Sequence, residues 1–234
     1  MKPFFTTKPV IFYRNTGSPD RECPTLSAIQ DAVENGADVI ALDIVPGEHE
    51  RPVITSANMT GPDADPLLLA DVLSAFPEQR FCVYFNEKNR RLAGSLCDVI
   101  RETGSEQRIL VSSNHGDNLK LVRFRCPETA TSFTLLGTVG FYWLFRSGLL
   151  NFRKRFSADV LLMPEGAGVS YLANQGLIAM AHERGIHVYV YIMNSSKQIK
   201  RVIKSGADGF ITDDPGFLKR ELDKNRHSGE ERHE

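Results

Sequence analysis

The chain has 234 residues, of which 41% are hydrophobic and 24% charged, and its formal net charge is −1 at pH 7. This composition excludes a disordered chain and fits one globular domain with a large core. The near-neutral charge excludes the broad basic field that unspecific nucleic-acid binding needs, so we expect no nucleic-acid partner.

Short apolar runs alternate with helical segments along the chain, a pattern typical of βα units and a parallel sheet. Eight runs are predicted barrel strands: Pro9–Tyr13, Val39–Ile44, Phe81–Asn86, Ile109–Ser113, Thr129–Phe133, Val160–Met163, Val188–Met193 and Gly209–Thr212. A further short strand, Pro52–Thr55, is expected to pair as a hairpin extension after the second. Helical spacing or composition marks seven segments between the strands: Thr25–Asn35, Asp65–Phe76, Arg90–Glu102, Leu119–Arg125, Phe141–Phe152, Ala173–Arg184 and Lys197–Lys204.

Two stretches, Gly36–Asp43 and Gly206–Asp213, repeat one pattern: a helix-ending glycine, a short apolar strand, and a carboxylate at the strand's carboxyl end. Pro215 then opens a last helix. We therefore predict a single α/β domain, a (β/α)₈ TIM barrel over residues 1–226, followed by a polar tail over residues 227–234. Because such barrels carry their chemistry at the carboxyl ends of the strands, the residues there decide the function.

Compartment and membrane signals are weak in this sequence. Cys23, Cys82, Cys97 and Cys126 have neither zinc-ligand nor redox spacing, so we expect reduced, mostly buried thiols. The amino terminus lacks the features of a secretory signal, which favours a cytoplasmic location. The uncharged run Ala130–Phe145 is shorter than the roughly 20 apolar residues that a spanning helix requires.

The stretch Phe141–Phe156 combines aromatic and leucine side chains with Arg146, Arg153, Lys154 and Arg155. This composition occurs in helices that lie in a membrane interface, and it predicts a peripheral membrane contact. An outer helix packed on the sheet, with a solvated basic end, is the alternative interpretation and the one we favour.

Five blocks, taken in order, resemble the signature segments of one enzyme family: Val10–Asn15, Thr25–Ile29, Ala41–Asp43, Ala181–Asn194 and Ile211–Pro215. The first stands where that family has an apolar strand followed by His-Arg-Gly, and the third where it has Glu-Leu-Asp. On these blocks the chain resembles the glycerophosphodiester phosphodiesterase family over nearly its whole length. The resemblance implies a TIM barrel, phosphoric diester hydrolysis in lipid metabolism, two catalytic histidines, and Ca or Mg held by carboxylates from the second and third strands.

The sequence departs from that family at the expected catalytic and wall positions. Tyr13 stands in place of the first histidine, and its ordinary pKa near 10 makes it a poor base. The second histidine position falls on Ser56, followed by Ala57 where the family has an aspartate. The family's small insertion is also missing, since Met59–Pro66 leads directly into the next helix.

The metal-ligand positions are changed as well. Ala41 replaces the first glutamate, and the Glu-x-Lys pair of the third strand falls on Tyr84 and Asn86. A shift of two residues would instead match the lysine to Lys88 and leave Asn86 at the glutamate position. Asp43 is the one retained ligand, too few for a hard divalent ion, so we expect no cofactor.

Several polar residues remain as candidates at the barrel mouth. Arg14 keeps its family position and suits a phosphate, although an ion pair with Asp43 explains it equally well. His115 and His49 follow strands and are possible relocated acid–base groups, although we favour a solvated hairpin loop for His49 and a role outside catalysis for His115. His182 and His187 are expected to be structural, on the opposite face of the barrel.

Three tyrosines, Tyr13, Tyr84 and Tyr191, are expected near strand ends at one mouth, with Asn86 and the inward Cys82 beside them. They either contact a small ligand or plug a vacant barrel, and we favour the plug. A loop, Pro164–Gly168, resembles a Pro-Glu loop of part of the family, and either a nearby phosphate or a solvated turn explains it.

Three functions stay open on the sequence. The first is a degenerate family member without normal metal-dependent hydrolysis that binds a phosphodiester or polyol phosphate through Arg14 and Asp43. The second is an active phosphoric diester hydrolase that uses altered residues, with His115 and Arg14 as acid and anion clamp. The third is an interaction or membrane-surface scaffold that uses the Phe141–Phe156 face.

Overall fold

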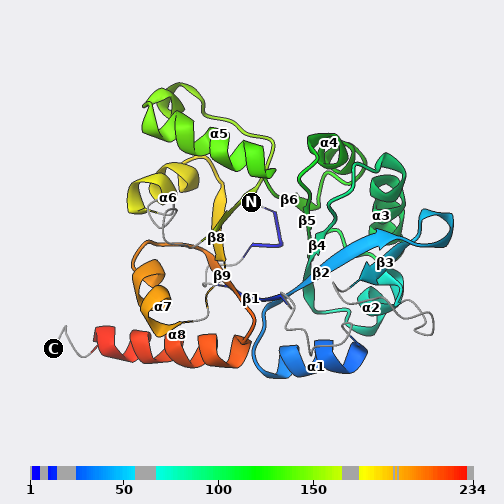
Figure 1. Ribbon diagram of the computed structural model, residues 1–234, viewed down its shortest axis with the longest axis horizontal. Helices are drawn as coiled ribbons and strands as arrows, with labels where there is room; N and C mark the ends of the chain where they lie inside the picture. The colour runs from blue at the N-terminus through cyan, green and yellow to red at the C-terminus, as the bar shows by residue number, and fades with distance from the viewer. Residues whose placement is uncertain are drawn as a thin grey trace.

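The chain folds into a nearly closed barrel of parallel strands surrounded by helices, as predicted (Figure 1). The computed structural model describes residues 2–5, 10–14, 25–55, 67–164, 174–191, 193 and 195–230. The strand order is β6-β5-β4-β2-β1-β9-β8-β7, and a single parallel bridge between Ser132 and Val160 closes the seam between β6 and β7.

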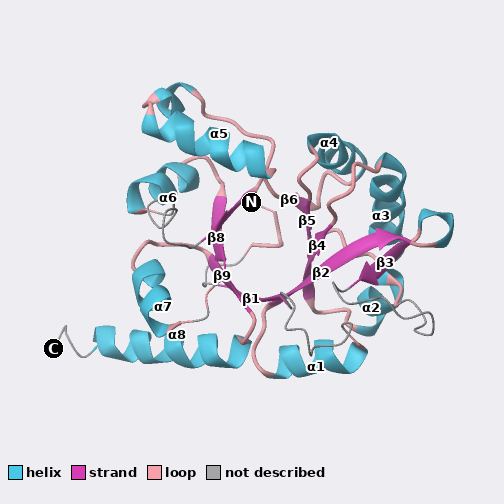
Figure 2. Cartoon of the chain, in the orientation of Figure 1, coloured by secondary structure: helices cyan, strands magenta, loops and turns pink. Residues whose placement is uncertain are grey.

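All eight predicted barrel strands are present: β1 Val10–Arg14, β2 Val39–Pro46, β4 Arg80–Tyr84, β5 Ile109–Ser112, β6 Ala130–Thr131, β7 Val160–Pro164, β8 His187–Tyr191 and β9 Gly209–Thr212. The predicted hairpin extension is confirmed, because β3, Pro52–Thr55, pairs antiparallel with the end of β2 (Figure 2). Strand β4 ends at Tyr84, so Asn86 lies in the loop that follows it rather than in the strand.

The helices are α1 Leu26–Glu34, α2 Leu69–Ala75, α3 Arg90–Glu102, α4 Gly116–Arg125, α5 Leu135–Arg146, α6 Gln175–His182, α7 Ser196–Ile203 and α8 Pro215–Glu230, with 3-10 turns η1 Glu48–Glu50 and η2 Leu149–Phe152. The predicted helix Phe141–Phe152 has the wrong bounds. Thr134 accepts a hydrogen bond from the Gly137 N–H and starts α5 earlier, and Gly148 in the left-handed conformation separates α5 from η2.

Two layers of apolar side chains hold the barrel together. Outward-facing residues of the strands pack under the helices in two large clusters, and a third cluster fills the interior with Phe12, Cys82, Leu110 and Tyr189 among others. Gly209 belongs to this interior, where a Cβ would lie 2.8 Å from Tyr189 Cδ1 and 2.9 Å from the Val10 carbonyl oxygen. Glycine is therefore required at the start of β9.

The amino-terminal segment closes the end of the barrel opposite the mouth. Phe4 and Phe5 are buried in the interior cluster. Lys2 donates to the Thr129 carbonyl oxygen at 2.6 Å and pairs with Asp159 at 3.1 Å, while Arg80 donates to the Phe4 carbonyl oxygen. These contacts tie the segment to the amino ends of the strands.

Aspartates at the amino ends of three strands have a shared structural role. Asp38 accepts from the Ile11 N–H, Asp159 from the Thr131 N–H, and Asp208 from the Val188 N–H, at 2.7 to 2.9 Å. Each carboxylate thus links its strand to a neighbouring one. The Gly-Ala-Asp part of the sequence repeat encodes this link as well as the helix-to-strand turn, in which Gly36 and Gly206 have positive φ.

Candidate active site at the barrel mouth

Four strands and two loops bring polar side chains together at the carboxyl face of the barrel. Asp43 on β2 is the register partner of Tyr84 on β4, and Arg14 ends the neighbouring strand β1. Tyr191 ends β8 and packs on the interior cluster. Because alternate residues of a strand face one side, Arg14, Asp43 and Tyr84 lie on the inward phase above Phe12, Ala41 and Cys82.

Arg14 and Asp43 form an ion pair at this mouth. The Arg14 Nη2 atom lies 3.0 Å from Asp43 Oδ1 and 3.5 Å from Asp43 Oδ2. Their side chains are 35% and 36% exposed, so solvent and a small anion can reach the pair. The Arg14 guanidinium also lies 5.3 Å from the centre of the Tyr84 ring, a cation–π distance.

A side-chain network extends from Tyr84 to the next strand. The Tyr84 hydroxyl donates to Asn86 Oδ1 at 3.1 Å, and Asn114 Nδ2 donates to the Tyr84 hydroxyl at 2.9 Å and to Asn86 Oδ1 at 3.0 Å. The sequence analysis did not single out Asn114 as a site residue. The sequence could have indicated Asn114 by its position two residues after β5, because the carboxyl ends of all the strands lie at the same edge of the barrel.

Burial raises the pKa of four groups around Arg14. Burial raises the pKa of the Asp43 carboxyl, and the Arg14 guanidinium opposes that rise. Burial likewise raises the pKa of the Tyr84 and Tyr191 hydroxyls, again with Arg14 in opposition. The pKa of the Cys82 thiol rises to about 12 by burial, so this thiol is neutral and not nucleophilic.

Tyr13 does not join this group, contrary to the prediction. Its side chain packs against the outer cluster between the sheet and the helices, because it holds the outward phase of β1 between Phe12 and Arg14. The mouth therefore contains two of the three predicted tyrosines. Neither of these two replaces the missing histidine as a base, since burial moves both pKa values upward.

The two candidate histidines lie in different places. His115 is the N-cap residue of α4 and follows Asn114 directly, so it is next to the Tyr84 network. His49 has a positive φ and lies in the exposed turn η1, which connects β2 to β3. Ser56, Ala57 and the Glu165 loop lie outside the described residues.

The donor atoms described at the mouth do not fit a calcium or magnesium ion. Arg14 already occupies both oxygens of the Asp43 carboxylate, and Asp213, directly after β9, is a second carboxylate at this edge of the barrel. Within the described ranges, no three His, Cys, Asp or Glu side chains come together in a way that could hold a metal. Ca prefers six to eight oxygen ligands, many more than these side chains offer. The absence of a metal cofactor stays a prediction, and the described donor atoms support it.

His182 and His187 lie at the other end of the barrel, where they contact Asp208. His182 Nε2 is 2.8 Å from Asp208 Oδ2, and His187 Nδ1 is 3.4 Å from Asp208 Oδ1. The His187 ring also stacks on Phe5 with centroids 3.9 Å apart. Both histidines thus take part in the packing of the barrel floor.

Comparison with known proteins shows similarity to one family of phosphodiesterases. The model of the glycerophosphoryl diester phosphodiesterase family matches residues 63–217. Lysophospholipase D GDPD3 of Mus musculus is 23% identical over 187 residues, which cover 70% of this chain. The chain spans only 56% of the length of that relative.

Solved structures share the fold over almost the whole chain. A glycerophosphodiester phosphodiesterase from Parabacteroides distasonis superposes with a TM-score of 0.69 at 14% identity, covering 95% of this chain and 99% of that one. An Oleispira antarctica phosphodiesterase, solved with its product sn-glycerol-3-phosphate, gives a TM-score of 0.69 at 13% identity, covering 92% and 97%. No helix among the described residues is long and apolar enough to cross a bilayer.

Proposed function

Because the chain belongs to the glycerophosphoryl diester phosphodiesterase family, we propose that its barrel mouth binds a phosphodiester or polyol phosphate without the family's metal-dependent hydrolysis. Arg14 would contact the phosphate oxygens, since a guanidinium offers a planar fork of donors. Asn86, Asn114 and the Tyr84 hydroxyl would hydrogen-bond the polyol part. Tyr191 would border the ligand on the β8 side.

The observation that carries this proposal is the ion pair between Arg14 and Asp43. At 3.0 Å, and with both side chains about one-third exposed, the pair keeps a cation in place at the mouth. An incoming phosphate competes with the Asp43 carboxylate for the same guanidinium. Binding is therefore expected to tighten when the carboxylate loses its charge.

The residues around that pair support the proposed lack of ordinary hydrolysis. Hydrolysis of a phosphodiester needs a proton donor for the departing oxygen and a group that activates the attacking one. Tyr84 and Tyr191 are the titratable hydroxyls at the mouth, and burial raises the pKa of both. Ala41 stands on β2, where the resemblance implies a glutamate, and it offers no metal ligand.

Calorimetry with sn-glycerol 3-phosphate tests the binding. Arg14→Gln is expected to weaken binding by about ten- to a hundredfold, the value of one charge-assisted hydrogen bond of roughly 1.5–3 kcal/mol. Asp43→Asn is expected to tighten it. Arg91→Gln, on the exposed surface of α3, is the matched control and should leave binding unchanged.

Two results would overturn this proposal. Equal affinity of the wild type and Arg14→Gln would remove Arg14 from the site. Hydrolysis of glycerophosphocholine that needs added Ca or Mg and stops with EDTA would contradict the loss of metal-dependent activity.

An active phosphoric diester hydrolase is the second candidate function. It is favoured by the position of His115 next to the Tyr84–Asn86–Asn114 network, and by the name lysophospholipase D carried by the Mus musculus relative. Under this candidate, His115 would act as acid and Arg14 would hold the anion. Release of choline from lysophosphatidylcholine that persists in His115→Ala would rule out this version.

A further inference from the structure

One flank of the barrel exposes large apolar side chains along α5 and η2. On α5, Leu136 is 81% exposed and Trp143 is 65% exposed, and on η2 Phe152 is 87% exposed. Leu136, Val139 and Trp143 follow helical spacing and so share one face of α5. We call this surface the α5 face, made up of Leu135, Leu136, Val139, Trp143, Leu149 and Phe152.

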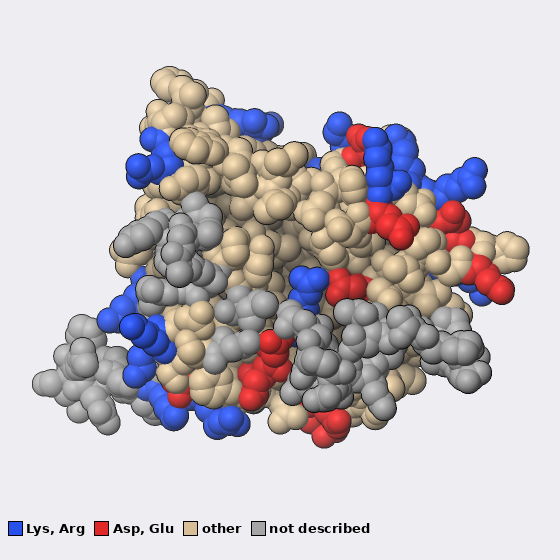
Figure 3. Space-filling view, in the orientation of Figure 1, with Lys and Arg blue, Asp and Glu red and all other residues tan. Residues whose placement is uncertain are grey.

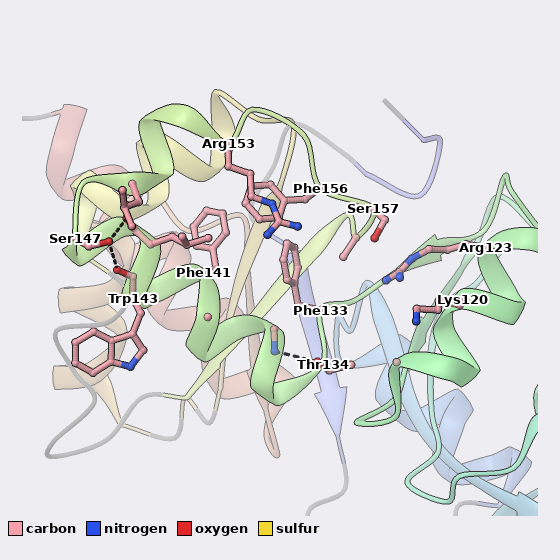
Figure 4. Close-up of a pocket in the computed structure, with 16 residues that line it drawn as sticks. Lys120, Arg123, Phe133, Thr134, Phe141, Trp143, Ser147, Arg153, Phe156 and Ser157 are labelled. Atoms are coloured by element: carbon pink, nitrogen blue, oxygen red, sulfur yellow. Dashed lines mark hydrogen bonds between the residues drawn. The ribbon is translucent and has the colours of Figure 1, made fainter.

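An apolar groove of about 680 Å³ adjoins the α5 face (Figure 4). Trp143 and Leu149 belong to both the groove lining and the α5 face, so the two are continuous. The rings of Phe133, Phe141 and Phe156 form its aromatic wall, with centroids 5.2 to 5.8 Å apart. Pockets of this volume are large enough for a small apolar ligand, and an acyl chain is of that kind.

The charge around this surface is of one sign. The thirty residues from Thr129 to Ala158 contain four basic side chains, Arg146, Arg153, Lys154 and Arg155, and no acidic one. Arg153 lies over the Phe156 ring at 4.5 Å. Arg146, Lys154 and Arg155 are exposed and have no ion-pair partner among the described residues. In Figure 3 the surface over α5 is mostly uncharged, with Lys and Arg at its edges.

Hydrogen bonds from a buried arginine fix the backbone beneath the α5 face. Arg184, with a side chain only 6% exposed, donates to the carbonyl oxygens of Leu150, Arg153 and Met180 at 2.7 to 3.0 Å. This arginine ties η2 and the segment after it to α6. The apolar side chains are thus presented by an ordered scaffold.

We propose that the α5 face docks on an anionic lipid bilayer, with Trp143, Leu136 and Phe152 in the interface and the groove receiving an acyl chain. Exposed aromatic and leucine side chains edged by arginine and lysine match the chemistry of such an interface. A second copy of this chain fits less well, because a symmetric contact through this face would bring two basic edges together. Leu135 starts α5 shortly after the carboxyl end of β6, so docking would bring the mouth side of the barrel near the lipid.

Trp143 is the single tryptophan of the chain, so its fluorescence reports directly on docking. With phosphatidylcholine vesicles that contain phosphatidylserine, we expect the emission to shift to shorter wavelength and lipids brominated on the acyl chain to quench it. Vesicles of phosphatidylcholine alone should give a much smaller shift. High salt should weaken the binding, because the basic edge is exposed to solvent.

Matched variants separate the two contributions in a vesicle co-sedimentation assay. Lys154→Gln with Arg155→Gln should lower partitioning about twenty-fivefold, since each charge near an anionic surface contributes about fivefold, or roughly 1 kcal/mol. Arg90→Gln with Arg91→Gln, two adjacent exposed arginines on α3, should change little. Leu136→Ser with Phe152→Ser should lower partitioning at least tenfold and leave the thermal unfolding temperature unchanged.

Three results would overturn the proposal. The first is the absence of both a spectral shift and co-sedimentation with phosphatidylserine vesicles. The second is binding that survives the Lys154 and Arg155 double variant. The third is a Trp143 shift that depends on protein concentration without lipid, which would assign the face to a contact between copies. Glycerol phosphate binding is measured without vesicles, so either proposal can fail alone.

Discussion

Arg14 shows how one side chain links several groups at the mouth. Its guanidinium pairs with Asp43 and lies over Tyr84, and it opposes the effect of burial on the pKa of Asp43, Tyr84, Tyr191 and Cys82. The sequence predicted both the position of Arg14 and its possible pairing with Asp43, because adjacent parallel strands end side by side. It placed Tyr13 wrongly, because the alternation of side chains along β1 turns this residue outward.

The raised pKa of Asp43 predicts a specific dependence of stability on pH. A carboxyl with a higher pKa in the folded state than unfolded holds its proton more tightly when folded. The stabilisation is complete below the unfolded value near 3.9 and is lost as the pH rises through the folded pKa. Between pH 3 and 7, urea unfolding should show that the free energy of unfolding of the wild type falls relative to that of Asp43→Asn. Parallel plots of this free energy against pH for the two proteins would contradict the prediction.

Tyr84 provides a second test at the residue scale. Tyr84→Phe keeps the ring under Arg14 but removes the hydroxyl that contacts Asn86 and Asn114, so we expect the free energy of unfolding to fall by about 0.5–1.5 kcal/mol. Tyr84→Leu also removes the cation–π contact and should cost more than Tyr84→Phe by about 0.5–1 kcal/mol. Chemical denaturation measures the loss of stability in both variants. Equal losses would show that the contact between the Tyr84 ring and Arg14 does not contribute to stability.

Among the elements, α3 shows how a local signal sets both a helix start and a long-range contact. The Asn89 side chain accepts from the N–H groups of Arg91 and Leu92, and its amide donates to Glu50 at 2.9 Å. The bounds of α3 were predicted correctly, because this cap and the apolar spacing agree. For α5, the prediction failed because the uncharged run from Leu135 carries no polar face to mark the first turns.

The cap of α3 has a measurable energy. Asn89→Ala should lower the free energy of unfolding by about 1 kcal/mol, the typical value of an N-cap. Asn89→Ser retains an oxygen acceptor for the helix but not the amide donor to Glu50, so it should recover most of this loss. If Asn89→Ser were as destabilising as Asn89→Ala, the contact with Glu50 rather than the cap would be the main contribution.

At the scale of the whole molecule, the barrel has a polar mouth and a closed floor. Phe4 and Phe5 fill the floor, and aspartates link the strands there. Asp208 accepts a hydrogen bond from the Val188 N–H and contacts both His182 and His187. The candidate site thus lies at one end of the strands and these structural contacts at the other, the usual arrangement in barrels of this kind.

The amino-terminal segment that closes the barrel floor is expected to be essential for stability. Phe4 is 1% exposed, so Phe4→Ala should lower the free energy of unfolding by about 3–5 kcal/mol through lost burial and a cavity. Phe124→Ala is the matched control, since Phe124 is 84% exposed and its loss should change stability by less than about 0.5 kcal/mol. Similar midpoints of thermal unfolding for both variants would show that burial of Phe4 in the barrel floor does not stabilise the protein.

Asp208 should have the opposite pH dependence to Asp43. Burial alone would raise the pKa of Asp208, but its contacts with His187, with the Val188 N–H and with His182 together outweigh burial and lower the pKa. The resulting stabilisation is present above the unfolded value near 3.9 and is lost as the pH falls through the folded pKa. Asp208→Asn should therefore be destabilising at pH 7, with the difference from wild type narrowing in acid unfolding measurements below about pH 4.

The sequence alone determined the βα repeat, the strand positions, the family and the adjacent positions of Arg14 and Asp43, because these depend on local periodicity and on the order of strand ends. The tertiary structure decided that the Arg14 and Asp43 side chains pair, that Asn114 joins Tyr84, that Phe4 and Phe5 close the floor, and that α5 leaves Trp143 exposed. These features depend on contacts between segments far apart in the chain. No local pattern records such contacts, since the same side chain can be buried or exposed according to what packs against it.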